Sequence, residues 1–102
     1  MADTFQLQVA TPEHLLLDAQ VTEAQLPGKN GYMGVLPGHA ALISALATGV
    51  LTYSGGGGAG RGVLNIGGGF VEVLDDHVSV LADTAEFAQD RQPDGGDSKQ
   101  PK

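Results

Sequence analysis

Three histidines are the residues of this chain that first suggest metal or acid–base chemistry. Imidazole is a common metal ligand and general base. However, His14, His39 and His77 stand far apart, none has a second ligand at i+4 spacing, and the chain has no cysteine. We therefore expect neither a metal site nor a cofactor.

A run of glycines from Gly55 to Gly60 contains the spacing G-x-G-x-x-G of dinucleotide-binding loops. In such sites the glycine loop leads into a helix whose amino end binds pyrophosphate. Here Val63-Leu64-Asn65-Ile66 follows, which favours a strand, and no G-x-x-x-x-G-K-[ST] motif occurs. We expect an exposed, mobile hairpin loop over residues 54–62. Nucleotide binding by this tract remains an alternative function.

Paired acids and serines lack the neighbours that catalysis needs. Asp75-Asp76 is explained as a turn between two strands, while Asp83 and Glu86 have the spacing of a helix cap. No serine stands in a G-x-S-x-G motif. No catalytic residue is predicted, and the chain is not expected to be an enzyme.

The clearest local pattern is the turn sequence Leu36-Pro37-Gly38-His39. Proline pre-sets the second position of a type II turn and glycine takes the left-handed third. This turn would fix the direction of His39. Two roles are open for that ring: a hydrogen bond to a nearby carbonyl that locks the loop, or contact with a partner.

Residues 28–36, just before this turn, are rich in glycine and carry Tyr32 and Met33. Gly28 is expected to adopt a positive φ after an alternating run that ends at Pro27. The pattern predicts a loop that brings two large side chains close to another surface. They serve either as core anchors or as interface residues.

Bulk properties exclude several partners. The chain has 102 residues and a formal net charge of −7 with five scattered basic residues, so we expect one domain that binds neither nucleic acid nor an anionic membrane face. It has no apolar run of about 20 residues and no signal peptide. We expect a soluble, cytosolic protein.

Period-two alternation predicts strands through most of the chain. Phe5, Leu7 and Val9 share one face, and residues 14–18 form a second strand. The apolar phase then shifts, which predicts a β-bulge near Thr22 or Glu23.

Farther along, residues 50–53 are expected to pair with residues 63–66, after Gly49 ends the preceding segment. Residues 70–74 and 78–82 form the last meander. Its inward residues are expected to be Val71, Val73, Val78 and Val80, with Glu72 and Ser79 facing out.

The end of the chain is predicted not to form strands. A helix is expected to start at residues 83–86 and to be stopped by Pro93-Asp94-Gly95-Gly96, and residues 92–102 have no apolar side chain with which to dock. The predicted domains are a β-sandwich at residues 1–86 and a short disordered tail at residues 87–102.

Two sequence blocks resemble the epsilon subunit of the F-type ATP synthase. The first has the family's G-x-x-G-x-x-P-G-H-x-x-L signature and consists of Gly31, Gly34, Leu36, Pro37, Gly38, His39 and Leu42. The second is Gly68-Gly69-Phe70-Val71-Glu72-Val73 followed by residues 78–83. The resemblance implies an all-β fold, a small β-sandwich of about ten short strands. It also favours extended chain over helix at residues 40–47.

The resemblance further implies a non-catalytic rotor subunit of the central stalk, which couples the gamma subunit to the c-ring during proton-driven ATP synthesis. It would be peripheral, on the cytoplasmic side of the bacterial inner membrane. The loop facing the c-ring would consist of Gly28, Lys29, Asn30, Gly31, Tyr32, Met33 and Gly34. The residues facing gamma would be His39, Ala40, Leu42 and Ser44, with Pro37 and Gly38 forming the structural turn.

Two departures from the family stand out. Many relatives carry an acidic residue where Tyr32 stands, and longer relatives continue into a C-terminal helical domain that restrains ATP hydrolysis. This chain is expected to lack that inhibitory segment. A stand-alone β-sandwich adaptor is the other alternative.

Overall fold

The computed structural model describes residues 3–55 and 60–88, and all regular structure within them is β-strand. The all-β class predicted from the sequence is confirmed. The strands are β1 (Phe5–Ala10), β2 (Leu15–Gly28), β3 (Gly31–Val35), β4 (Leu42–Gly55), β5 (Arg61–Leu74), β6 (His77–Ala82) and β7 (Ala85–Phe87).

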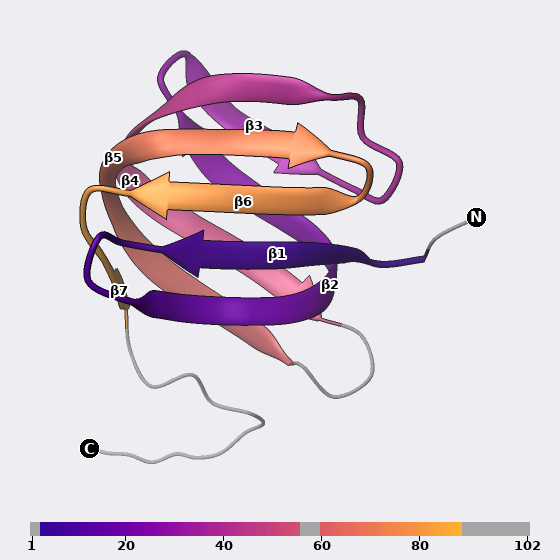
Figure 1. The fold of residues 1–102 in the computed structure, drawn as a ribbon, viewed down its shortest axis with the longest axis horizontal. Helices are drawn as coiled ribbons and strands as arrows, with labels where there is room; N and C mark the ends of the chain where they lie inside the picture. The colour runs from indigo at the N-terminus through magenta and orange to yellow at the C-terminus, as the bar shows by residue number, and fades with distance from the viewer. Residues whose placement is uncertain (1–2, 56–59, 89–102) are drawn as a thin grey trace.

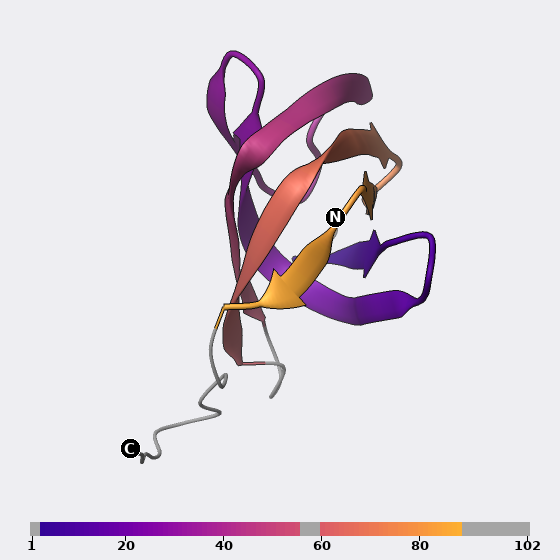
Figure 2. The same cartoon turned by 90° about the vertical axis from the view of Figure 1, so that its left-hand side faces the viewer.

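The strands form a small closed β-sandwich. The sheet order is β1-β6-β5-β4-β2-β3, with β7 beside β5, and β1 also pairs with β2 so that the sheet closes on itself. β1 runs parallel to β6, whereas its pairing with β2 is antiparallel. Figure 1 looks onto the layer that holds β1 and β6, and Figure 2 shows the layers from the side. We call the layer with β1 and β6 the front sheet and the layer with β3 and β7 the back sheet.

Three strands of 14 residues, β2, β4 and β5, belong to both sheets. The pairing of β2 with β4 shifts register between Val21 and Glu23, where the change of apolar phase predicted a bulge. That prediction is confirmed. β5 passes between the sheets at residues 67–69, where Gly68 and Gly69 have φ values of +79° and +122°.

Alternation places one side of each sheet in a common core. Phe5, Leu7 and Val9 are at most 1% exposed, as their spacing predicted. The four valines predicted to point inward are also buried: Val71, Val73, Val78 and Val80. Burying a side chain of this size contributes about 1.5–3 kcal/mol, which makes these rows the main source of stability.

The strands are fewer and longer than the ten short strands expected. Residues 14–18 are not a separate strand, because β2 continues from Leu15 through the bulge. Gly49 was predicted to end a strand but lies inside β4. A Cβ at Gly49 would lie 2.7 Å from the Cβ of Pro27 and 3.0 Å from the Tyr32 hydroxyl, so glycine is needed there for close packing. The expected extended conformation of residues 40–47 is confirmed from Leu42 onward.

The loop predicted over residues 28–36 is mostly a β-hairpin. β2 runs to Gly28, β3 begins at Gly31, and Lys29-Asn30 forms a two-residue turn between them. Gly28 was predicted to have a positive φ, which is wrong; Gly31 has it instead, at +127°. Gly28 is a close-approach position, because a Cβ there would lie 2.7 Å from the carbonyl oxygen of Gly31.

The helix predicted to start at residues 83–86 is wrong. Residues 85–87 form β7, which pairs with residues 64–66 of β5. The N–H of Gly67 also donates to the Thr84 carbonyl at 2.8 Å. Tertiary pairing therefore overrides the local capping pattern. The β-sandwich was predicted to end at residue 86, and β7 extends to Phe87; the predicted tail from residue 89 onward lies outside the described residues.

Gly69→Ala is expected to lower the free energy of unfolding by about 2–4 kcal/mol, because an L-residue is strained at its φ and its Cβ would collide with the Leu81 carbonyl oxygen. Urea unfolding followed by circular dichroism measures this. Gly34→Ala is the control: a Cβ there meets nothing within 4 Å, so the change should stay within about 0.5 kcal/mol. Equal midpoints for the two variants would contradict our explanation of the β5 bend.

Candidate functional site

The β2–β3 hairpin carries the seven residues predicted to face the c-ring. Lys29 and Asn30 at its tip are exposed, and the hairpin projects from one end of the molecule in both views (Figures 1 and 2). Met33 pairs with Leu26 and packs against the core, so it is an anchor. Tyr32 is 59% exposed and Gly34 is exposed beside Gln25. The tip and Tyr32 are therefore the parts of the hairpin that a partner can reach.

Tyr32 also has a structural task within its own chain. It stands opposite Pro27, which has no N–H, and the β2–β4 ladder is interrupted between Gln25 and Gly28. At this gap the N–H of Val50 donates to the Tyr32 hydroxyl at 2.9 Å. The phenol therefore supplies an acceptor that the interrupted ladder lacks and ties the hairpin to β4.

The turn predicted from Leu36-Pro37-Gly38-His39 is confirmed. The N–H of His39 donates to the Leu36 carbonyl at 3.1 Å, and Gly38 has a φ of +85°. Nδ1 of His39 lies 2.7 Å from the Ala40 carbonyl oxygen, which is the locking role considered for this ring. The N–H of Gly38 donates across the molecule to Oδ1 of Asp76 at 2.6 Å.

The residues predicted to face gamma do not lie on one surface. Leu42 and Ser44 pair with the buried Val73 and Val71, so they lie on the inner face of the front sheet, and Leu42 packs against the core. Their neighbour Ile43 faces outward and is 72% exposed. His39 is half-buried and Ala40 is exposed.

An uninterrupted row of apolar side chains crosses the outer face of the front sheet. Each member pairs directly with the next across β4, β5, β6, β1 and β2, so all five lie on the same face. We call this set the outer apolar row: Ala45, Phe70, Leu81, Ala10 and Leu15. Phe70, Leu81 and Leu15 are 60%, 57% and 52% exposed, and Ile43 lies on the same face two residues before Ala45. Exposed apolar side chains gathered in this way mark interaction surfaces.

Sequence reasoning missed the outer apolar row, although part of its signal was present. The alternation of side chains along a strand puts Phe70 on the same face as Glu72 and on the other face from Val71. In the same way, Ile43 lies on the other face from Leu42. An apolar residue on the polar face of a strand is the clue. Whether such residues line up in one row depends on the register between strands, including the shift between Val9 and Ala10. The sequence of a single strand does not show this register.

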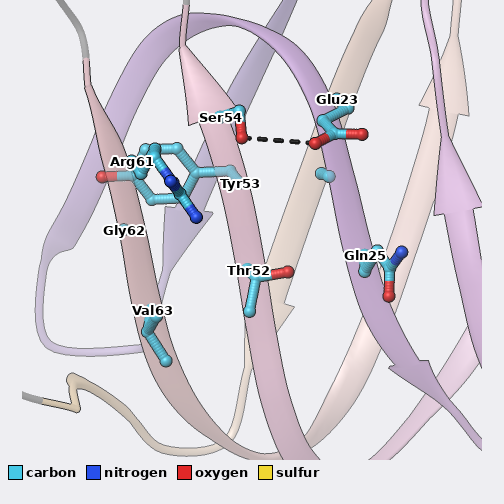
Figure 3. Close-up of a pocket in the computed structure, with 9 residues that line it drawn as sticks. Glu23, Gln25, Thr52, Tyr53, Ser54, Arg61, Gly62 and Val63 are labelled. Atoms are coloured by element: carbon cyan, nitrogen blue, oxygen red, sulfur yellow. Dashed lines mark hydrogen bonds between the residues drawn. The ribbon is translucent and has the colours of Figure 1, made fainter.

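The outer face of the back sheet is polar by contrast. One hollow on it, of about 230 Å³, is lined by residues of β2, β4 and β5 (Figure 3). Ser54 Oγ donates to Glu23 Oε2 at 3.2 Å beside it, and Arg61 begins β5 at its edge. The hollow is open and its carboxylate is exposed, so it provides no enclosed catalytic environment.

The glycine tract does not meet the structural requirement of a dinucleotide loop, because β5, a strand, follows it from Arg61. Residues 56–59 of the tract lie outside the described residues. The histidines are also apart: Nε2 of His77 lies 2.7 Å from Oε1 of Gln8, and His14 is exposed. Within residues 3–55 and 60–88, no group of three His, Cys, Asp or Glu side chains could hold a metal ion. No helix of the described chain could cross a membrane.

These features define a small closed β-sandwich with an outer apolar row on one face and a projecting hairpin at one end. Residues 4–88 match the family model described as ATP synthase, Delta/Epsilon chain, beta-sandwich domain. The chain belongs to this family, and the resemblance drawn from its two sequence blocks is confirmed.

Curated proteins similar to this chain belong to the same family. The chain is 54% identical over 90 residues to the ATP synthase epsilon chain of Solibacter usitatus, covering 88% of this chain and 66% of that protein. It is 45% identical over 86 residues to the epsilon chain of Koribacter versatilis, covering 84% and 59%. The chain thus spans roughly three-fifths to two-thirds of the length of these relatives.

Solved structures agree on the fold. A chain in the Euglena gracilis mitochondrial ATP synthase (OSCP/F1/c-ring) superposes with a TM-score of 0.78 at 26% identity, covering 85% of this chain and 55% of that one. A chain from the Tetrahymena thermophila mitochondrial ATP synthase central stalk and c-ring gives a TM-score of 0.65 at 14% identity, covering 93% and 79%. At that identity the second match shows the fold alone.

Tyr32→Phe is expected to lower the free energy of unfolding by about 0.5–1.5 kcal/mol, because it removes only the acceptor of the Val50 N–H. Hydrogen exchange measured by NMR should show faster exchange at Val50. The amide of Leu51, in the same strand but not bonded to Tyr32, is the internal control. Unchanged exchange at Val50 would contradict the structural task assigned to the phenol.

Proposed function

We propose that this chain serves as a non-catalytic central-stalk subunit of an F-type ATP synthase, coupling the gamma subunit to the c-ring. Family membership supports the complex, and two exposed surfaces at different places on the sandwich, the outer apolar row and the hairpin tip, support the coupling role. A subunit that transmits torque needs stiff contacts at both surfaces. Strands that bridge both sheets meet that need better than loops do.

The outer apolar row is the single observation that carries this proposal, and we assign it to the gamma subunit. Its exposed members, with Ile43, lie on one face, whereas the back sheet presents polar groups such as Gln25, Thr52 and Asn65 outward. Apolar side chains at the centre and polar groups at the rim are the usual anatomy of a protein interface. A patch of about 800 Å² on each partner is the standard size for such an interface.

The hairpin tip is assigned to the c-ring. Lys29 and Asn30 are exposed at the end of the molecule, and the Tyr32 hydroxyl is already bonded to Val50. In this chain the polar contact is therefore made by the tip, and the ring of Tyr32 supplies apolar surface beside it. The proposed location is peripheral, on the cytoplasmic side of the bacterial inner membrane, with attachment through the complex.

Leu81→Thr is expected to weaken binding to the gamma subunit of the same organism at least tenfold, since it removes an apolar side chain from the centre of the row. Threonine is β-branched and suits a strand, and the Leu81 side chain is 57% exposed, so the free energy of unfolding should change by less than about 1 kcal/mol. Calorimetry with purified gamma measures the affinity.

The matched control is Val63→Thr, an apolar-to-threonine change on the outer face of the back sheet. It should alter gamma binding less than twofold. If Val63→Thr weakens binding and Leu81→Thr does not, the assignment of the front sheet to gamma is wrong.

Lys29→Glu is expected to weaken the association of the assembled soluble complex with c-ring-containing membranes, by about three- to tenfold at low salt, because it reverses the charge of the tip. Arg61→Glu makes the same charge change in an exposed residue at the start of β5. Co-sedimentation with membranes compares the two. Equal losses for both variants would mean that net charge is responsible and not the hairpin tip.

A further inference from the structure

Asp76 links the Leu36-Pro37-Gly38-His39 turn to the rest of the front sheet. Its Oδ1 accepts the Gly38 N–H at 2.6 Å from a residue 38 positions away in sequence. Its backbone carbonyl accepts the N–H of Gln6, near the start of β1, at 2.9 Å. A single residue of the β5–β6 turn thus bonds to two other parts of the chain.

The backbone at this turn is itself unusual. Asp75 and Asp76 have φ values of +53° and +59° and connect Leu74 to His77, which are paired across the hairpin. Positive φ is uncommon for residues other than glycine, and two such residues form a type I′ turn, for which Asn-Gly and Asp-Gly are favoured. Glycine at position 76 would suit the backbone but would offer no acceptor to Gly38. The carboxylate explains why aspartate stands where glycine is the easier choice.

The turn has few other bonds that reach beyond it. In the described chain, the hydrogen bonds of residues 36–40 are the contacts of His39 with Leu36 and Ala40, inside the segment, and the bond from Gly38 to Asp76. The last of these is the one that joins the turn to another element. Without it the turn is held at its two ends, by β3 and β4.

We infer that Asp76 is a positioning residue. It holds the turn that leads into Ile43 at the start of β4, and so sets how this end of the proposed gamma surface is presented. This inference rests on the proposed function. A turn released from Asp76 samples several directions, and only a fraction of these matches the partner. The apparent affinity for gamma then falls in proportion to that fraction.

Three variants of the full chain test the inference. Asp76→Gly removes the acceptor while suiting the positive φ, and Asp75→Gly makes the same backbone change at the neighbouring residue, whose side chain has no hydrogen bond among those described. Asp76→Asn keeps an oxygen acceptor and tolerates the turn. Two properties are measured: hydrogen exchange at the Gly38 amide in the free chain, and affinity for purified gamma.

We expect Asp76→Gly to speed exchange at Gly38 and to weaken gamma binding about tenfold, the size expected for one charge-assisted hydrogen bond. Asp76→Asn should stay within about threefold of the original affinity, and Asp75→Gly within about twofold. If the two glycine variants bind gamma equally well, Asp76 has no positioning role. If the unchanged chain does not bind gamma at all, the proposed function fails, and exchange at Gly38 still decides whether Asp76 holds the turn.

Discussion

The structure depends on the bend of β5 at residues 67–69. There one strand leaves the back sheet, where it pairs with β7, and enters the front sheet, where it pairs with β6. Gly69 lies so close to the Leu81 carbonyl that a side chain has no room, and its φ is one that L-residues avoid. The bend therefore fixes where Phe70, the next residue, stands on the outer face. Backbone geometry and the proposed partner surface are set by the same short segment.

The two outer faces differ in a way that follows from this architecture. On the front sheet, β1 pairs with both β2 and β6, so Leu15, Ala10 and Leu81 are brought into line with Phe70. On the back sheet the outward positions carry mainly polar side chains, among them Gln25 and Thr52. Exposed apolar surface carries a cost in water unless it is covered, whereas a polar face is stable alone. The front face is thus the one that we propose a partner covers.

Much of the fold could be predicted from local pattern. Alternation identified the inward residues of β1 and the last meander, the phase shift located the bulge in β2, and Pro37-Gly38 identified the turn. What failed depended on contacts between distant residues. Gly49 was predicted to end a strand, but glycine is needed there because Pro27 and the Tyr32 hydroxyl pack against it. The local pattern does not show these two neighbours. A helix start was predicted at residues 83–86 because the local pattern does not show that residues 85–87 pair with a distant strand.

The site was predicted less completely than the fold. The turn was identified from Pro37 and Gly38, whereas the hairpin was predicted as a loop. Leu42 and Ser44, predicted to face gamma, lie on the inner face of the front sheet, because they pair with the buried Val73 and Val71. Asp76 was explained as a turn former, and its bond to Gly38 depends on how two distant turns meet. Register and turn contacts are tertiary properties, so pattern in a single segment cannot supply them.

The most direct test of the account is an NMR cross-saturation measurement, in which gamma is irradiated and signal loss is recorded at the methyl groups of this chain. The account predicts loss at Ile43, Leu81 and Leu15 on the front face and little at Val63 on the back sheet. Saturation of Val63 with unaffected Leu81 and Leu15 would contradict it.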